Sequence, residues 1–183
     1  MTKTSAILLA TLLLAVSVPC APQDHLGGIR AGMPFPDHAG FDAMHPGGDL
    51  VSPSGLLAGK GATSVFLSFF QTTCGACLVE IDQLKARQDA LRAHGVEVLL
   101  VGVKEEPADL RRLAVRRGWP FPVLADRFDG PYSHRCGVFD AKEDLLLPSA
   151  VLLAKGRDGT MVLKAAWQGG EPDIVARILD AAK

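Results

Sequence analysis

Residues 65–80 read VFLSFFQTTCGACLVE, an apolar run followed by two cysteines and the start of a helical pattern. The apolar run predicts a buried strand over residues 63–70. Apolar side chains then recur at helical spacing through residues 76–94, and Gly95 follows as a helix C-cap would. This part of the chain therefore predicts a strand, a turn carrying Cys74 and Cys77, and a single long helix.

The rest of the chain continues the alternation of strands and helices. Its periodicity and turn composition predict strands at 96–103, 149–154 and 161–166 and helices at 107–117 and 172–182. In the helix at 107–117, the apolar residues Leu110, Leu113 and Ala114 form the expected inner stripe. A strand–helix–strand opening implies parallel strands, and the closing hairpin adds antiparallel ones, so we expect an α/β or α+β sandwich with a mixed sheet.

Composition and charge exclude several classes of function. The chain has 183 residues, the size of one domain, and 48% of them are hydrophobic. With 19 basic and 20 acidic side chains the net charge is −1, so there is no electrostatic basis for general nucleic-acid binding or for adsorption to an anionic membrane. Phosphate-binding loops, nucleophile elbows and dinucleotide fingerprints are absent from the sequence.

The N-terminal residues differ from the rest. Lys3 precedes an almost wholly apolar run at residues 6–18, which has the length of a secretory signal rather than of a membrane span. We expect residues 1–20 to be a signal peptide, cleaved near Cys20 or of the lipoprotein type with Cys20 lipidated. Residues 21–60 are expected to be an extension packed on the domain, with one short hairpin and a turn at 59–61, and residues 61–183 to be the domain itself.

Cys74 and Cys77 stand where a strand ends and a helix begins. The unpaired amides and the dipole at a helix N-terminus favour an anion, so they lower the pKa of the Cys74 thiol. Cys77, one turn later, is placed to resolve a mixed disulfide formed at Cys74. The alternatives are half of a zinc site, for which no second ligand pair exists in the sequence, and two inert buried thiols.

These motifs resemble exported disulfide reductases of the TlpA/ResA type, within the wider redoxin and AhpC/TSA-like group. The resemblance covers roughly residues 30–183. It rests on the opening motif GMPFPD, the segment at 65–80 quoted above, GWPFPVLAD and LPS, at residues 32–37, 65–80, 118–126 and 147–149. It implies a thioredoxin-like fold, with a central mixed sheet flanked by helices, and an N-terminal extension.

The resemblance also implies an activity and partners. It implies reduction of protein disulfides, without a cofactor, at the periplasmic or outer face of the bacterial envelope, with a membrane thiol donor that reduces the Cys74–Cys77 pair again. The chain departs from the family pattern at Thr73, Ala76 and Asp82, where tryptophan, proline and proline are usual. The dipeptide between the cysteines influences the reduction potential, so the sequence leaves open whether the protein reduces or oxidises its clients.

Two further residues are candidate site residues. The resemblance implies that Pro148 is the cis-proline of a loop over the active site, although most proline bonds are trans. Glu80, one turn after Cys77, could relay the Cys77 proton, or it could be a solvated acid that favours the helix N-terminus. Ser68 stands where thioredoxins proper often carry a buried acid, so that proton relay is expected to be missing.

Other readings remain open. Cys136 is expected to be a buried small hydrophobe, or else a third redox thiol or, with His134, part of a copper site as in copper chaperones of this fold. A peroxiredoxin-like peroxidase is a second enzymatic reading, although Gln71 stands three residues before Cys74. Two groups of charged side chains are expected to be mainly solvated: the arginines Arg111, Arg112, Arg116 and Arg117, which could attract an acidic partner, and the histidines His25, His38 and His45.

Overall fold

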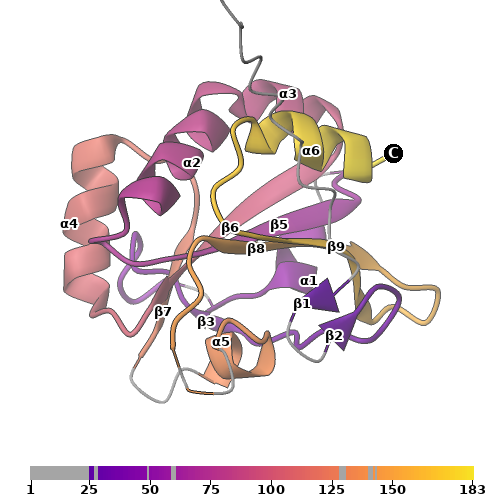
Figure 1. Ribbon diagram of the computed structural model, residues 1–183, viewed down its shortest axis with the longest axis horizontal. Coiled ribbons are helices and arrows are strands. Elements are labelled where there is room, and N and C mark those ends of the chain that lie inside the picture. Colours follow the sequence, from indigo (N-terminus) through magenta and orange to yellow (C-terminus); the bar gives the residue numbers. More distant parts are fainter. Residues whose placement is uncertain are drawn as a thin grey trace, which may run out of the picture.

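The chain folds around a five-stranded mixed sheet (Figure 1). The computed structural model describes residues 25–26, 29–48, 50–58, 61–127, 131–139, 142 and 144–183. The sheet has the order β7-β6-β5-β8-β9, with bounds Val123–Asp126, Val96–Val103, Ser64–Phe70, Ser149–Lys155 and Met161–Gln168. Strands β5, β6 and β7 are parallel, whereas β8 and β9 run antiparallel to their neighbours. The predicted mixed sheet is confirmed.

Six helices and two small hairpins surround the sheet within the described residues. The helices are α1 (Pro53–Leu57), α2 (Gly75–Ala86), α3 (Gln88–Ala93), α4 (Pro107–Arg117), α5 (Pro131–Arg135) and α6 (Ile174–Ala181). The hairpins are β1 (His25–Leu26) with β2 (Ile29–Arg30), and β3 (Gly40–Phe41) with β4 (Leu50–Val51). No helix in the described residues is long and apolar enough to cross a bilayer.

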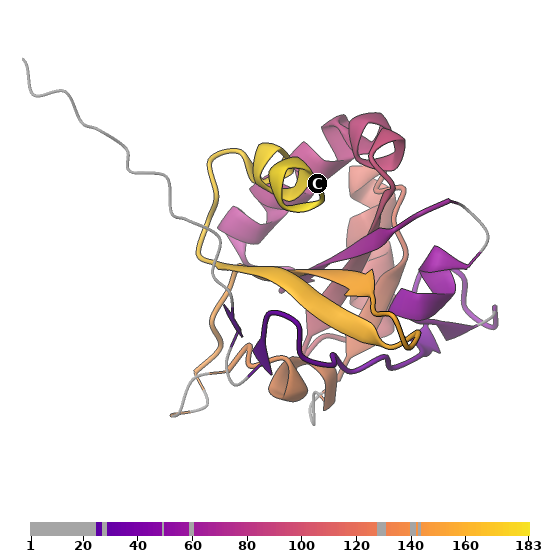
Figure 2. The same cartoon turned by 90° about the vertical axis from the view of Figure 1, so that its right-hand side faces the viewer.

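Each face of the sheet has its own hydrophobic core. On β5, Phe66 and Phe70 face the core beneath α2, α4 and α6. Leu67 and Phe69 face the other core, which is covered by α5 and the N-terminal segment. This alternation follows from the two-residue period of a strand, and because both faces are covered, β5 is apolar at nearly every position. Figure 2 shows the two layers: α2 and α6 lie above the sheet, with α5 and the N-terminal segment below it.

Most predicted elements are confirmed, but the helix predicted over residues 76–94 is wrong. At Arg87 the backbone leaves helical geometry, with φ −122° and ψ 26°, and the segment divides into α2 and α3. The Arg87 guanidinium pairs with Asp173, which precedes α6. Periodicity could not reveal this break, because the buried residues Leu84 and Leu91 keep helical spacing across it. The strand β7 and the short helix α1 were not predicted.

The N-terminal segment crosses the sheet from one edge to the other. Near β9, the Phe35 amide donates a hydrogen bond of 2.8 Å to the Met161 carbonyl. Near β7 the Ala43 amide donates to the Val123 carbonyl, also at 2.8 Å. The segment holds two hairpins, so the expectation of a single hairpin is wrong. The predicted signal at 1–20, Cys20 included, and residues 59–60 of the predicted turn lie outside the described residues.

Candidate redox site

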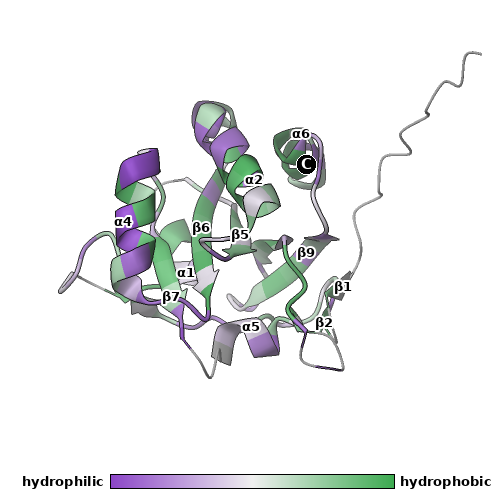
Figure 3. Cartoon of the chain, turned by 60° about the vertical axis from the view of Figure 1, so that its left-hand side comes forward, coloured by the Kyte–Doolittle hydropathy of each residue, from purple (hydrophilic) through white to green (hydrophobic). Residues whose placement is uncertain are grey.

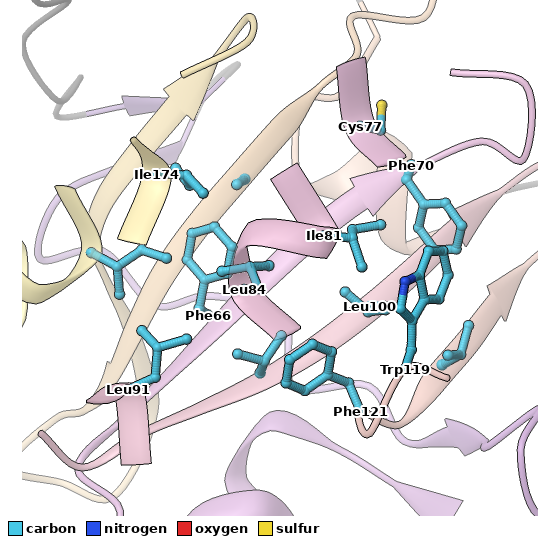
Figure 4. Packing of buried hydrophobic residues seen from close by; sticks show 14 of the residues in the cluster. Phe66, Phe70, Cys77, Ile81, Leu84, Leu91, Leu100, Trp119, Phe121 and Ile174 are labelled. Atoms are coloured by element: carbon cyan, nitrogen blue, oxygen red, sulfur yellow. The ribbon is translucent and has the colours of Figure 1, made fainter. Parts of the chain in front are cut away.

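Cys74 and Cys77 form a disulfide at the N-terminus of α2. Cys74 is the N-cap residue, and its Sγ accepts a hydrogen bond from the Cys77 amide at 3.3 Å. Cys77 is fully buried in the same core as Phe70 (Figure 4), and Cys74 is only partly buried. Cys74, the less buried member of the pair, is therefore the one that a substrate can reach, and it lies where the helix dipole stabilises a thiolate.

Glu80 lies one turn below Cys77 and is only 4% exposed. Its Oε1 accepts a hydrogen bond of 2.7 Å from the backbone amide of Glu171. The pKa of Glu80 is raised to about 7, mainly by burial; the amide hydrogen bond from Glu171 opposes this rise, and the Glu171 charge adds a smaller one. The interpretation of Glu80 as a solvated acid is therefore wrong. A carboxyl with this pKa can take up and release a proton near neutral pH.

The loop between β9 and α6 is held against α2 by several contacts. Besides Glu80, the Gln83 side chain bonds to this loop, donating to the Pro172 carbonyl and accepting from the Ile174 amide, both at 3.3 Å. Gly170 of the loop lies beside Ala76, because a Cβ on this glycine would stand 3.9 Å from the Ala76 Cβ. The loop therefore borders the CxxC turn and holds the Glu80 carboxylate in place.

Glu171 itself is buried and forms an ion pair. Its carboxylate lies 3.7 Å from the Nε of Arg177 in α6, and the Glu171 side chain is only 6% exposed. A buried carboxylate is costly unless a cation compensates it, and Arg177 provides that charge. Sequence reasoning missed Glu171, because no local pattern places it beside Glu80.

On the side of the disulfide toward β6, which we call the open side, Glu105 holds the turn that precedes Cys74. One oxygen of its carboxylate accepts hydrogen bonds from both the amide and the hydroxyl of Thr72, at 2.7 and 2.8 Å. The residue before it, Lys104, has a left-handed backbone with φ 56°. Such a conformation is uncommon outside glycine and marks a constrained site. Glu105 was also missed, although it comes two residues after β6, at the same end of the sheet as Cys74.

The peptide bond between Leu147 and Pro148 is cis, as the resemblance implied. The next residue, Ser149, is paired with Phe69 of β5. Pro148 therefore lies at the end of β5 from which the CxxC turn leaves the sheet. Its carbonyl accepts a hydrogen bond of 2.8 Å from the Gly169 amide, which links the proline loop to the loop beside Ala76.

Cys136 and His134 lie in different environments. Cys136 is fully buried in the core below the sheet, and burial together with the Asp126 charge raises the pKa of its thiol well above the usual value. His134 is exposed and stacks on Phe139, with ring centroids 4.3 Å apart. Among the described residues, no group of three or more acidic, histidine or cysteine side chains could hold a metal. Nothing in this geometry favours the copper reading.

Ser68 and Asp82, at which the resemblance implied other residue types, have distinct surroundings. The Ser68 side chain is buried on the α2 side of the sheet, and its hydroxyl has no hydrogen-bond partner among the described residues. Asp82 accepts hydrogen bonds from Arg117 at 2.6 Å and from the Trp119 indole at 3.2 Å. Asp82, where the resemblance implied a proline, thus links α2 to the end of α4.

The predicted solvated groups are confirmed only in part. Arg111, Arg112 and Arg116 are exposed, but Arg117 turns toward Asp82 and is half-buried. His45 is exposed and bonds to Asp42 at 2.8 Å, whereas His38 is partly buried against Tyr132. The side chain of His25 lies outside what the structure describes.

A disulfide at the start of the helix after the central strand, beside a cis-proline loop, defines a thioredoxin-fold protein with a redox-type site. The chain belongs to the AhpC/TSA family, whose model matches residues 32–159. Solved structures support the fold. A thiol:disulfide interchange protein of the thioredoxin family from Chlorobium tepidum has a TM-score of 0.62 at 18% identity, covering 84% of this chain and 98% of its own. Peroxidoxin BcpB from Mycobacterium tuberculosis has a TM-score of 0.68 at 15% identity, covering 84% and 96%.

Curated relatives match over a shorter part of the chain. The thiol-disulfide oxidoreductase ResA of Geobacillus thermodenitrificans is 37% identical over 71 residues, which is 39% of this chain and 39% of that protein. ResA of Halalkalibacterium halodurans is 30% identical over 97 residues, covering 53% and 49% respectively. The matched region thus spans less than half of the length of either relative.

Proposed function

We propose that the protein is a thiol–disulfide oxidoreductase that reduces disulfides in other proteins through Cys74 and Cys77. The observation that carries this proposal is the pairing of an accessible Cys74 at the α2 N-terminus with a buried Cys77 and a buried Glu80 one turn below it. The names of the curated relatives and of the thioredoxin-family structure support the same class of reaction.

The first step is attack by Cys74. In the reduced protein, its thiolate is stabilised by the α2 N-terminus, including the Cys77 amide that lies 3.3 Å from the sulfur in the disulfide form. The thiolate attacks one sulfur of the client disulfide, forming a mixed disulfide and releasing the other client sulfur as a thiolate, which takes up a proton. We assign Pro148 to this step, because it belongs to the loop along which the client chain would lie.

The second step is resolution by Cys77. Glu80 accepts the Cys77 proton, and the Cys77 thiolate attacks the Cys74 sulfur of the mixed disulfide. The Cys74–Cys77 bond forms, and the second client sulfur leaves and is protonated. Two electrons and two protons pass from the protein to the client, so a separate thiol donor must return the protein to its dithiol form.

The test uses reduced protein and an excess of a disulfide-bonded client, with mass spectrometry of the products. C74S should abolish reaction, while C77S should accumulate one mixed disulfide per chain at Cys74. C136A is the matched control, because this third thiol is buried in the other core, and it should react like the parent protein. Unchanged client reduction by C74S would refute the mechanism.

We assign this activity to the space outside the cytoplasm, with a membrane protein as the thiol donor. The apolar run at residues 6–18 after Lys3 supports export, and Cys20 supports a lipid anchor as one form of it. Fusing residues 1–30 to a reporter enzyme that is active only after export tests this assignment. The reporter should be active in the parent fusion and inactive when Leu12 and Leu13 are both replaced by arginine.

The peroxidase reading has less support from the site. A peroxidatic thiolate needs a cation beside it, yet the side chain bonded to the turn before Cys74 is the Glu105 carboxylate. The likeness to peroxidoxin BcpB is a likeness of fold. Rapid loss of hydrogen peroxide, with sulfenic acid at Cys74 in the C77S variant, would favour this second function.

A further inference from the structure

A groove runs along α4 at the β7 edge of the sheet, with a volume of about 1380 Å³. One wall is α4, and the other is the segment at residues 40–47, which is joined to β7 through a bridge between Asp42 and Leu124. From Pro107 to Arg116, both of which line it, the groove follows α4 for about 14 Å, the length of roughly four extended residues.

The groove combines apolar surface with positive charge. Phe41 and Val115, among its lining residues, are 69% and 62% exposed, which is unusual for large apolar side chains. Its charged lining consists of four arginines and one aspartate, namely Arg111, Arg112, Arg116, Arg127 and Asp42. Figure 3 shows hydrophilic segments along α4, in contrast to the hydrophobic strands of the sheet.

The positive charge of this groove is only partly compensated by nearby carboxylates. The Asp42 carboxylate is buried and accepts hydrogen bonds from the Met44 and Val123 amides, both at 3.0 Å. Among the described residues, Arg111 and Arg116 have no carboxylate within ion-pair distance, while Arg112 pairs with Asp109 and Arg127 lies 3.6 Å from Glu106. The protein as a whole has a net charge of −1, so this positive surface is local.

The groove reaches the end of the sheet at which the redox site lies, where the parallel strands have their carboxyl ends. Strands β5, β6 and β7 are parallel, so Cys74, Glu105 and Arg127 all follow the carboxyl ends of neighbouring strands. Two inter-strand spacings separate β5 from β7, a distance of roughly 10 Å. A client chain whose disulfide meets Cys74 can therefore enter the groove with a short intervening segment.

We infer that this groove binds an extended segment of the client protein in which acidic and apolar residues alternate close to the disulfide. The inference rests on the proposed disulfide reduction, and it gives α4 a role in selecting which client proteins are reduced. Carboxylates of the client meet Arg111 and Arg116, while its apolar side chains cover Phe41 and Val115. Contacts of this kind at an exposed rim act mainly on the rate of encounter and depend on salt.

The test uses three peptides, each with one cysteine held as a mixed disulfide with thionitrobenzoate. After a Gly-Ser-Gly spacer, the first carries Glu-Leu-Glu-Leu, the second Lys-Leu-Lys-Leu and the third Ser-Gly-Ser-Gly. Second-order rate constants are measured with pre-reduced protein at low and high salt. The parent protein should reduce the acidic peptide about tenfold faster than the basic one at low salt, and the difference should shrink at high salt.

Two double variants locate the effect. R111E/R116E should remove or reverse the preference and leave the rate with the Ser-Gly peptide unchanged. R92E/R157E makes the same change of charge on exposed arginines at the opposite end of the sheet, and it should keep the preference. The neutral R111Q/R116Q variant checks that any loss does not come from the added acidic charges.

The outcomes separate the two proposals. Failure of all three peptides to react would refute disulfide reduction itself. Equal rates for the three peptides, or equal effects of the two charge-reversal variants, would refute the groove while leaving the reduction intact. Sedimentation showing a dimer that only R111E/R116E dissociates would make the groove an interface between copies of this chain, and would also overturn the inference.

Discussion

The two sides of the Cys74–Cys77 disulfide differ in how their carboxylates are held. On the inner side, Glu80 is buried under α2, bonded to a single backbone amide, and its pKa is raised to about 7. On the open side, Glu105 is partly buried and accepts two hydrogen bonds from Thr72. Both are glutamates within a few residues of the strand ends or the helix start, yet their surroundings give them different tasks.

This contrast separates proton transfer from positioning. A buried carboxyl with a raised pKa is suited to exchange a proton with Cys77, because both of its protonation states are populated near neutral pH. A carboxylate that accepts two hydrogen bonds from one residue is suited to hold the turn before Cys74 in one geometry. Substitutions on the two sides should therefore affect different steps of the reaction.

The largest effect is expected from E80Q on the resolving step. Glutamine can still accept the Glu171 amide bond but cannot take the Cys77 proton, so resolution should slow by about 100-fold above pH 7. Stopped-flow decay of the mixed disulfide measures this step. In the parent protein the rate should rise as pH passes through 7, and the E80Q profile should lack that rise; matching profiles would exclude Glu80 as the base.

The same substitution should change stability in a pH-dependent way. The folded protein holds the Glu80 proton to about pH 7 while the unfolded chain releases it near 4.5, so the folded state binds more protons in that window and loses stability as pH rises through it. E80Q should therefore be more stable than the parent at pH 8 by about 3 kcal/mol, and closely similar at pH 4. Urea unfolding of the disulfide forms at both pH values provides the comparison, and an equal difference at the two would contradict the linkage.

A smaller effect is expected on the open side. E105A removes the acceptor for both Thr72 bonds, so the turn before Cys74 loosens and the limiting rate of Cys74 attack should fall about tenfold. E105Q, which keeps an oxygen acceptor, should lose much less. Single-turnover rates with a small disulfide, measured at a pH where Cys74 is fully ionised, separate this geometric effect from a change in the Cys74 pKa. Equal rates for E105A, E105Q and the parent would show that Thr72 needs no partner.

The smallest effect is expected from E171Q. Removing the Glu171 charge takes away one cause of the raised Glu80 pKa, and Arg177 is left to favour the ionised form. The pH midpoint of resolution should move to lower pH, while the rate at pH 8 should stay within about threefold of the parent. A midpoint that moved upward would show that the Glu171 charge does not act on Glu80.

Much of this arrangement could be predicted along the chain. The strand before Cys74, the inner stripe of α4 and the cis bond at Pro148 follow from periodicity or from resemblance, and each is confirmed. The break at Arg87 and the four-residue strand β7 were not predicted. The contacts that hold β7 come from distant segments, which local patterns do not record, and the apolar spacing runs unbroken across Arg87.

By itself, the sequence determined the redox pair, the parallel unit around it and the alternation that makes both faces of the sheet apolar. These features depend on spacings of two, three or four residues, and such spacings persist in any compact arrangement of the chain. Only the tertiary structure decided that Glu80 is buried against Glu171, that Glu105 holds Thr72, and that Arg111 faces a groove shared with Phe41. The physical reason is that burial, and with it the pKa of an acid or the free charge of an arginine, depends on which distant segments pack beside it.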